Sequence, residues 1–196
     1  MRNNKHKKKK LRIMLILLVI LIVLILIFLF GNRKEKIKHE GRPAGTEQVA
    51  GRTAEIKMKP VTLFFLSESD GLLHAEERQI PESDLNGEAR AVVEELIKGP
   101  QTGLMAVIPE NTRLRQLFVT ADGLAYVDLS RQVTEANFYG SSGEMAVVYS
   151  IVDSLTYNFK SIKKVSLLVE GNERETLGGH VDLSNPFVPD YSLIAR

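Results

Sequence analysis

The side chains that could do acid-base or metal chemistry are spread thinly along the chain. Its four histidines are dispersed: His6 and His39 flank an apolar run, His74 falls within a predicted strand, and His180 follows two glycines. A zinc site needs at least three protein ligands held together, so His74, His180 and a carboxylate could bind zinc only if the fold brought them side by side. The absence of cysteine excludes a disulfide and a thiolate metal site.

Adjacent carboxylates are the other candidates for acid-base chemistry, at Glu76-Glu77, at Glu94-Glu95 and from Glu173 to Glu175. Neighbouring residues on a strand or helix point in different directions, and acidic side chains usually lie on the surface. We therefore expect these carboxylates to form solvated faces. The chain also lacks the G-x-S-x-G, H-E-x-x-H and G-x-x-x-x-G-K motifs. The sequence thus predicts a protein that is not an enzyme and uses no metal ion or cofactor.

The tetrapeptide VDLS occurs twice, at Val127 to Ser130 and at Val181 to Ser184. In each copy the Asp and the Ser could form a catalytic or ligand-binding pair. The alternative is that an apolar strand end runs into a turn, where Asp and Ser side chains bind nearby backbone amides. We favour the turn in both copies, because local capping needs no third partner.

A long apolar run precedes all of these residues. Ile13 to Phe30 are consecutive apolar residues, and with Leu11 they approach the roughly 20 residues that cross a bilayer as a helix. The basic residues before the run place the N-terminus in the cytoplasm. A cleaved signal peptide would have a shorter apolar core and small residues at its cleavage site. We therefore predict a basic cytoplasmic tail over 1–10 and an uncleaved transmembrane signal anchor over 11–30.

The charge of the chain divides beyond the predicted anchor. Residues 31–57 are polar and rich in glycine, which predicts a flexible linker with a reach of about 30 Å. Residues 1–57 hold 14 Lys and Arg against 4 acidic residues, whereas residues 58–196 hold 12 against 20. A nucleic-acid-binding domain would carry a basic footprint, so we expect no nucleic-acid partner. The basic tail fits anionic lipid and membrane topology better.

Residues 58–196 form the predicted extracytoplasmic domain, in which pairs of strands alternate with helices. Period-two patterns and turn residues predict strands over 61–66, 72–80, 113–120, 124–129, 164–171 and 173–177. The hairpin connections imply antiparallel pairing. We expect an α+β fold of order ββαββαββ, with one mostly antiparallel sheet and two amphipathic helices packed on one of its faces.

Both helices are predicted from apolar residues at helical spacing. The first covers Leu85 to Ile97, is capped by Ser83 or Asp84, and ends at Gly99-Pro100 because Gly accepts the left-handed conformation and Pro cannot continue the helix. The second runs from about Ser142 to Phe159. Ser141 and Glu144 have the spacing of a capping box, and its buried stripe is expected to comprise Val148, Ile151, Val152, Leu155 and Phe159.

Five ordered segments of this domain resemble the GerMN domain family of sporulation and spore germination proteins. They are ELIKGP, IPENTRL, DGLAYVDLS, IVDSLTYNF and GGHVDLSNPF, and the resemblance covers about Val61 to Pro189 in a single copy. We interpret the motif residues as structural. They are Gly99, Pro100, Pro109, Asp122, Gly123, Val127, Asp128, Leu129, Ser130, His180, Asp182, Leu183, Ser184 and Pro186.

The resemblance implies a non-enzymatic module of the cell envelope, since the family is associated with assembly of a protein complex between two membranes during sporulation. We expect a single-pass protein of the inner (cytoplasmic) membrane, whose extracytoplasmic domain binds envelope proteins or forms a homo-oligomer. The alternative is a module that binds a small ligand or a cell-wall fragment. A pocket with converging polar groups would favour the ligand, whereas an exposed apolar patch or an unpaired sheet edge would favour protein assembly.

Overall fold

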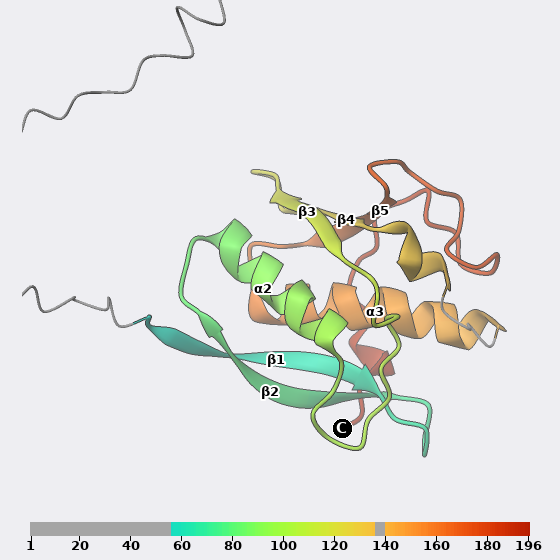
Figure 1. Ribbon diagram of the computed structural model, residues 1–196, viewed down its shortest axis with the longest axis horizontal. Helices are drawn as coiled ribbons and strands as arrows, with labels where there is room; N and C mark the ends of the chain where they lie inside the picture. Colours follow the sequence, from blue (N-terminus) through green and yellow to red (C-terminus); the bar gives the residue numbers. More distant parts are fainter. Residues whose placement is uncertain (1–55, 136–139) are drawn as a thin grey trace, which may run out of the picture. The chain divides into compact units, whose positions relative to one another are not determined.

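The computed structural model describes residues 56–135 and 140–196 (Figure 1). The predicted tail over 1–10, the predicted membrane span over 11–30 and nearly all of the predicted linker over 31–57 lie outside these residues. Within the described ranges, no helix is both long enough and apolar enough to cross a membrane. The anchor therefore stays a prediction from the sequence.

A two-stranded antiparallel hairpin opens the domain. It consists of β1 (Met58–Leu66) and β2 (Leu73–Pro81). The turn between them uses the predicted Asp70-Gly71 pair: the Asp70 side chain accepts a hydrogen bond from the Leu72 N–H at 3.1 Å, and Gly71 has a φ of 70°. The hairpin forms a sheet of its own and pairs with no other named strand of the described chain.

Helix α2 (Leu85–Lys98) follows the hairpin and confirms the predicted element. Asp84 is its N-cap, and the Asp84 carboxylate accepts a hydrogen bond from the Gly87 N–H at 2.8 Å. Gly99 ends the helix with a φ of 82°, a conformation that side chains with a Cβ rarely adopt. The apolar face of α2 is buried through Ala89, Val92, Val93 and Leu96.

A three-stranded sheet forms the second half of the domain. Strand β3 (Leu114–Val119) pairs antiparallel with β4 (Leu124–Leu129), and β4 pairs parallel with β5 (Lys164–Val169). The short 3-10 helix η1 (Arg131–Glu135) and helix α3 (Gly140–Asn158) lie between β4 and β5 in the chain, and η2 (Tyr191–Leu193) lies near its end. A long crossover through a helix is what parallel pairing of β4 with β5 requires.

The α+β class is confirmed, but two predicted features of the sheet are wrong. The strands form two sheets rather than one, and both helices contact strands of each sheet, so that Figure 1 shows the helices between the hairpin and the three-stranded sheet. The predicted strand over 173–177 is also absent, which leaves the order ββαββαβ. Glu170 and Gly171, with φ of 55° and 77°, turn the chain sharply after β5, and only an isolated bridge joins Val169 to Asn172.

Helix α3 is buried on more sides than the sequence indicated. Its predicted apolar stripe is confirmed, since Val148, Ile151, Val152, Leu155 and Phe159 all belong to the core. The predicted capping box is wrong, because the helix begins at Gly140 and the Glu144 carboxylate binds a distant loop. Polar side chains of α3 are buried as well, and they are Glu144, Ser150, Asp153, Ser154 and Thr156.

Three of the polar side chains of α3 close the outer edge of β1. The Ser150 hydroxyl donates to the Phe64 carbonyl at 2.6 Å, and the Phe64 N–H donates to the Ser154 hydroxyl at 3.0 Å. One helical turn further on, the Asn158 amide donates to the Thr62 carbonyl at 2.6 Å and accepts from the Thr62 N–H at 2.9 Å. Because these residues are four apart, they lie on one face of the helix, and that face takes the place of a neighbouring strand.

Candidate functional site

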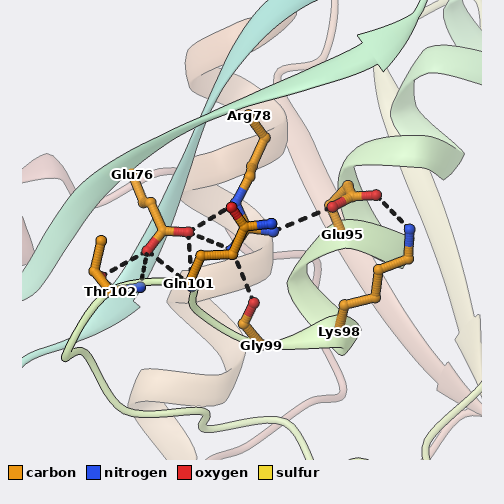
Figure 2. A network of polar contacts seen from close by, with 7 residues as sticks. All are labelled: Glu76, Arg78, Glu95, Lys98, Gly99, Gln101 and Thr102. Carbon is orange, nitrogen blue, oxygen red and sulfur yellow. Dashed lines mark hydrogen bonds and ion pairs between the residues drawn. The ribbon is translucent and has the colours of Figure 1, made fainter.

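Two charged residues of β2 are buried beside each other against α2. The strand alternates between its faces, so Glu76 and Arg78 point to the same side, and they are only 7% and 6% exposed. The Arg78 guanidinium donates to Glu76 Oε1 from Nε at 2.7 Å and also from Nη2 (Figure 2). It reaches the end of α2 as well, donating to the Glu95 carboxylate at 3.2 Å and to the Gly99 carbonyl at 2.9 Å.

The Glu76 carboxylate also holds the loop that follows α2. It accepts hydrogen bonds from the Gln101 N–H at 3.1 Å, the Thr102 N–H at 3.0 Å and the Thr102 hydroxyl at 2.6 Å. Burial by itself raises the pKa of Glu76, but the bonds from Thr102, Gln101 and Arg78 outweigh burial and lower that pKa below its usual value. The ionised carboxylate therefore joins β2 to the loop after α2, a role that we call a clasp, and it is not free to act as a base.

The expectation that the paired carboxylates form solvated faces is therefore wrong for Glu76. Successive residues of a strand point to opposite faces of the sheet, so Glu76 points inward. Glu77, on the opposite face, is exposed, as expected. The other pairs lie at the surface or partly buried, since Glu94, Glu173 and Glu175 are exposed and Glu95 is intermediate.

A second buried carboxylate, Glu144 on α3, holds the C-terminal loop. Its side chain is fully buried, and it accepts hydrogen bonds from the N–H groups of Leu177 at 2.8 Å, Gly178 at 3.0 Å and His180 at 2.9 Å. Burial raises the pKa of Glu144, but the N–H groups of Gly178, His180, Leu177 and Val181 together lower it below its usual value. The carboxylate is thus charged at neutral pH and neutralised by backbone dipoles.

This contact explains the sequence GGH in the second half of the domain. Gly179 has a φ of 103°, and the chain wraps around the carboxylate by means of this turn. The His180 ring is half exposed, with Nδ1 at 3.4 Å from Glu144 Oε2. His74 instead lies 2.8 Å from the carboxylate of Asp70 in the hairpin turn. In the ranges that the structure describes, no three His, Cys, Asp or Glu residues are placed to hold a metal ion.

The first VDLS sequence connects strands, which corrects the expectation of a local turn. Asp128 lies within β4, and its carboxylate accepts hydrogen bonds from the Gly171 N–H at 2.7 Å and from the Arg115 guanidinium at 3.1 Å. Ser130 exchanges bonds with Arg113, because its hydroxyl accepts from the Arg113 N–H and its own N–H donates to the Arg113 carbonyl, both at 2.9 Å. Both side chains therefore fix the ends of the three-stranded sheet.

The second VDLS sequence does form a local turn, although no strand precedes it. The Asp182 carboxylate accepts from the N–H of Ser184 at 2.9 Å and from the Ser184 hydroxyl. These bonds lower the pKa of Asp182, first through the Ser184 hydroxyl and then through its N–H. Leu183 between them is buried in the core. Identical tetrapeptides thus make different contacts, set by what surrounds them.

Replacing the two aspartates should separate these roles. Asp128→Ala should lower the free energy of unfolding by about 2 kcal/mol, because it removes charge-assisted bonds and leaves the Gly171 N–H without its acceptor. Asp182→Ala should have a clearly smaller effect, because Asp182 is exposed and its bonds are local. Denaturant unfolding of the two variants beside the wild type measures the difference. Equal losses in the two variants would contradict the assigned contacts.

The other motif residues occupy turns and strands rather than a common site. Gly99 and Pro100 end α2, and the Pro109 carbonyl accepts from the Thr112 N–H at 2.9 Å. Asp122 and Gly123 form the β3–β4 turn; Gly123 has a φ of 88°, and a Cβ there would lie 2.4 Å from the Ser161 carbonyl oxygen. Those that remain are Val127 and Leu129, buried in β4, and Pro186, exposed before Phe187.

A third buried carboxylate, Asp153 on α3, is incompletely paired. Its Oδ1 accepts from the Asp190 N–H at 3.0 Å, whereas its Oδ2 accepts no hydrogen bond from the described residues. Burial raises the pKa of Asp153 to about 6; the Asp190 N–H opposes this rise and the Asp190 charge adds to it. A carboxyl group with a raised pKa is a candidate acid or base when it lies in a cleft, but the Asp153 side chain is fully buried.

Asp153→Asn should stabilise the protein near neutral pH and change little near pH 4. The folded-state pKa of about 6 lies above the ordinary 3.8, so the folded protein keeps a proton that the unfolded chain releases. Wild-type stability therefore falls as the pH rises through this window. A pKa shift of this size corresponds to a loss of at most about 3 kcal/mol in the free energy of unfolding. Asn carries no charge, and its side-chain oxygen can still accept from the Asp190 N–H, so the variant should regain this free energy. Unfolding at both pH values measures the effect, and a change that is independent of pH would contradict it.

A pocket in the described surface has a volume of about 410 Å³. It lies between the tip of the hairpin, the first turns of α3 and η2. Apolar side chains dominate its lining, and the polar ones are Ser141, Ser142 and Tyr149. None of the motif residues lines it. Its apolar residues are Leu66, Leu73, Met145, Ala146 and Leu193.

The outer edge of β2 is a second surface feature. The Leu73 carbonyl accepts from the Ala195 N–H at 2.9 Å, which closes the start of this edge. Beyond Leu73 the pairing with β1 leaves the N–H and carbonyl groups of Ala75, Glu77 and Gln79 pointing away from β1. Within the described part of the chain, none of these groups has a hydrogen-bond partner. This stretch is an unpaired sheet edge.

Comparison with known proteins decides the family. Residues 62–175 match the Germane family, which is described as sporulation and spore germination. The chain belongs to this family. The match spans both helices and all of the strands from β2 to β5, and it ends before the C-terminal loop that Glu144 holds. The resemblance noted in the sequence is thereby confirmed.

Three solved structures share the fold of this Germane domain. The tandem GerMN domains of the sporulation protein GerM from Bacillus subtilis have a TM-score of 0.56 at 24% identity, covering 67% of this chain and 46% of that one. The first GerMN domain alone has a TM-score of 0.52 at 24% identity, covering 66% and 97%. A candidate lipoprotein from Clostridium perfringens has a TM-score of 0.50 at 24% identity, covering 68% and 89%.

The coverage agrees with one copy of the domain, because this chain spans nearly all of the single GerM domain but under half of the tandem. No curated protein matches the chain. Since the identities are low, these likenesses show the fold of the Germane domain and not its partners.

Proposed function

We propose that this chain is a membrane-anchored, non-enzymatic protein of the cell envelope, whose Germane domain binds other envelope proteins during sporulation or germination. The observation that carries the proposal is the open edge of β2, because an unpaired edge is a template for a strand from another chain. The family description supplies the process. The apolar run over 11–30 supports the anchor.

The state of the polar groups supports binding rather than catalysis. Glu76, Glu144 and Asp128 are each bound by backbone N–H groups or by arginine, so they hold the fold together. Asp153 is sealed inside. Several large apolar and aromatic side chains, in contrast, are exposed, and they include Phe118, Tyr157, Val188 and Tyr191.

Crosslinking in native membranes tests this proposal. The full-length chain should sediment with membranes, and a photo-crosslinker placed on the exposed side of β2 should capture defined envelope proteins. A crosslinker at exposed Glu173, remote in sequence from β2, is the matched control. Release of the chain by an alkaline wash would contradict the anchor. Recovery of no envelope protein, together with saturable binding of cell-wall fragments, would refute the interaction role.

A second candidate function is binding of a small ligand, and the pocket favours it. Its volume of about 410 Å³ falls in the range of small-molecule sites. The lining is mostly apolar, however, and few polar groups converge on it. A sugar or peptide fragment of the cell wall would leave most of its hydrogen-bonding groups without partners there, so we rank this function second.

A further inference from the structure

We infer that the open edge of β2 receives an extended, basic segment of a partner protein, which adds a third strand to the hairpin. The inference rests on the proposed function, because it names the surface through which the domain binds and the chemistry of the segment. Its evidence is the hydrogen-bonding state of each strand edge and the charge along β2.

The other strand edges of the described chain are each covered over part of their length. The edge of β1 is covered by side chains of α3 and by the Met105 N–H, which donates to the Leu66 carbonyl at 2.8 Å. The edge of β5 pairs with Phe187 through two backbone bonds of 2.8 and 2.7 Å. On β3, the Val119 N–H donates to the Asn86 side chain at 2.9 Å, and Leu117 is the one outward-facing residue between Gln116 and Val119 whose N–H and carbonyl have no partner among the described residues. The stretch of β2 from Ala75 to Gln79 stands apart, with three successive donor and acceptor pairs open.

The direction of the open groups follows from the register of the hairpin. Glu82 N–H donates to the Lys57 carbonyl and Ser67 N–H to the Leu72 carbonyl, both at 2.8 Å, so the hydrogen-bonded pairs of β1 and β2 involve the even-numbered residues of β2. The odd-numbered residues therefore present their backbone outward. A strand of about six residues would satisfy all three, given a rise of about 3.4 Å per residue.

Charge decides between a second copy of this chain and a basic partner. In the antiparallel self-pairing that uses all three open residues, Glu77 of one copy would face Glu77 of the other, and like charges directly opposite each other are unfavourable. A Lys or Arg in that place would instead form a favourable cross-strand pair. Residues 58–196 also carry an excess of acidic residues, 20 against 12, which would attract a basic segment.

The probe is a pair of synthetic peptides, acetyl-(Lys-Thr)4-amide and its acidic twin with Glu in place of Lys. Titration of the isotope-labelled full-length chain in detergent, followed by NMR, should show the amides of Ala75, Glu77 and Gln79 shifting with the basic peptide. The acidic peptide should bind at least about fivefold more weakly. Equal binding of the two peptides, or no binding of either, would overturn the inference.

A proline substitution in the edge distinguishes strand addition from nonspecific attraction between the basic peptide and the acidic domain. Gln79→Pro removes an outward N–H but no bond to β1, so the hairpin should persist while the basic peptide binds at least about fivefold more weakly. Gln79→Ala, the matched control, keeps the N–H and should bind within about twofold of the wild type. If Gln79→Pro does not fold, the basic peptide N-methylated at alternate residues, which cannot form the ladder, should fail to bind the wild type. Binding that survives both changes would overturn the inference.

Glu77→Lys gives a test of opposite sign, because the chain should then prefer the acidic peptide. If the Glu77→Lys variant bound neither peptide, this result would count against a cross-strand pair between residue 77 and the peptide. Capture of envelope proteins that persists in Gln79→Pro would overturn the role of the edge while leaving the proposed function intact. Absence of capture by the wild type would refute the proposed function, whatever the peptides do.

Discussion

Glu144→Ala should lower the free energy of unfolding by about 3 to 5 kcal/mol, the usual effect of breaking a buried charged contact. Three N–H groups, those of Leu177, Gly178 and His180, would lose their common acceptor, and the Leu177 N–H among them is buried. Each buried donor without a partner is unfavourable by about 1 to 3 kcal/mol. The C-terminal loop would therefore detach from α3 before the rest of the domain unfolds.

Denaturant unfolding gives the total loss in this variant, and hydrogen exchange at the three amides locates it. Glu144→Gln should fall between the wild type and Glu144→Ala, because the amide keeps one oxygen acceptor but turns an NH2 group toward the backbone donors. Glu173→Ala, at an exposed position nearby in the chain, is the control and should change stability by less than about 0.5 kcal/mol. Wild-type protection of the three amides in Glu144→Ala would refute the role of Glu144 in holding the C-terminal loop.

The pH dependence of the Glu144 contribution has a defined sign. The pKa of Glu144 is lowered in the folded protein from its ordinary 4.5, so the contact contributes its full stability above that value. As the pH falls below 4.5 toward the folded-state pKa, the unfolded chain takes up the proton first, and the contribution disappears. The difference in stability between the wild type and Glu144→Gln should therefore shrink in acid.

Local elements of the fold could be predicted from the sequence because their signals are local. Asp84 and Gly99 bound α2, Asp70-Gly71 and Asp122-Gly123 make the two hairpin turns, and the apolar spacing of α3 marks its buried stripe. Each of these features depends on residues within a few positions of each other. The pairing of β4 with β5 does not, because residues about 40 apart in the chain must meet, and the hairpin signals favoured antiparallel neighbours.

The polar residues that hold the domain together were harder to predict, since their partners lie far away in the chain. Glu144 has the spacing of a capping box with Ser141, yet its partners lie more than 30 residues later. The sequence does carry one signal of such contacts, because Ser150, Ser154 and Asn158 recur every fourth residue within a largely apolar helix. A polar stripe inside a buried helix indicates backbone groups that need partners, which here belong to β1.

Glu76→Ala should also lower the free energy of unfolding by about 3 to 5 kcal/mol, and by more than Arg78→Met. Removing the carboxylate takes away the buried counter-charge of Arg78 on its own strand, leaving Glu95 as its remaining acidic partner. It also takes away the acceptor of the Gln101 and Thr102 N–H groups (Figure 2). In Arg78→Met the Glu76 carboxylate keeps Gln101 and Thr102 as donors, so we expect a loss of about 2 kcal/mol.

The relative size of the losses in Glu76→Ala and Arg78→Met shows whether Glu76 holds the loop after α2 or only forms an ion pair with Arg78. If the Glu76–Arg78 pair alone mattered, either substitution would leave one buried charge, and the two losses would be equal. Because Glu76 joins β2 to the loop after α2, Glu76→Ala should also increase hydrogen exchange at the Gln101 and Thr102 amides. Glu77→Ala, on the exposed face of the same strand, is the matched control for stability. A loss in Arg78→Met equal to that in Glu76→Ala, with the two loop amides still protected, would refute the clasp and leave only the ion pair.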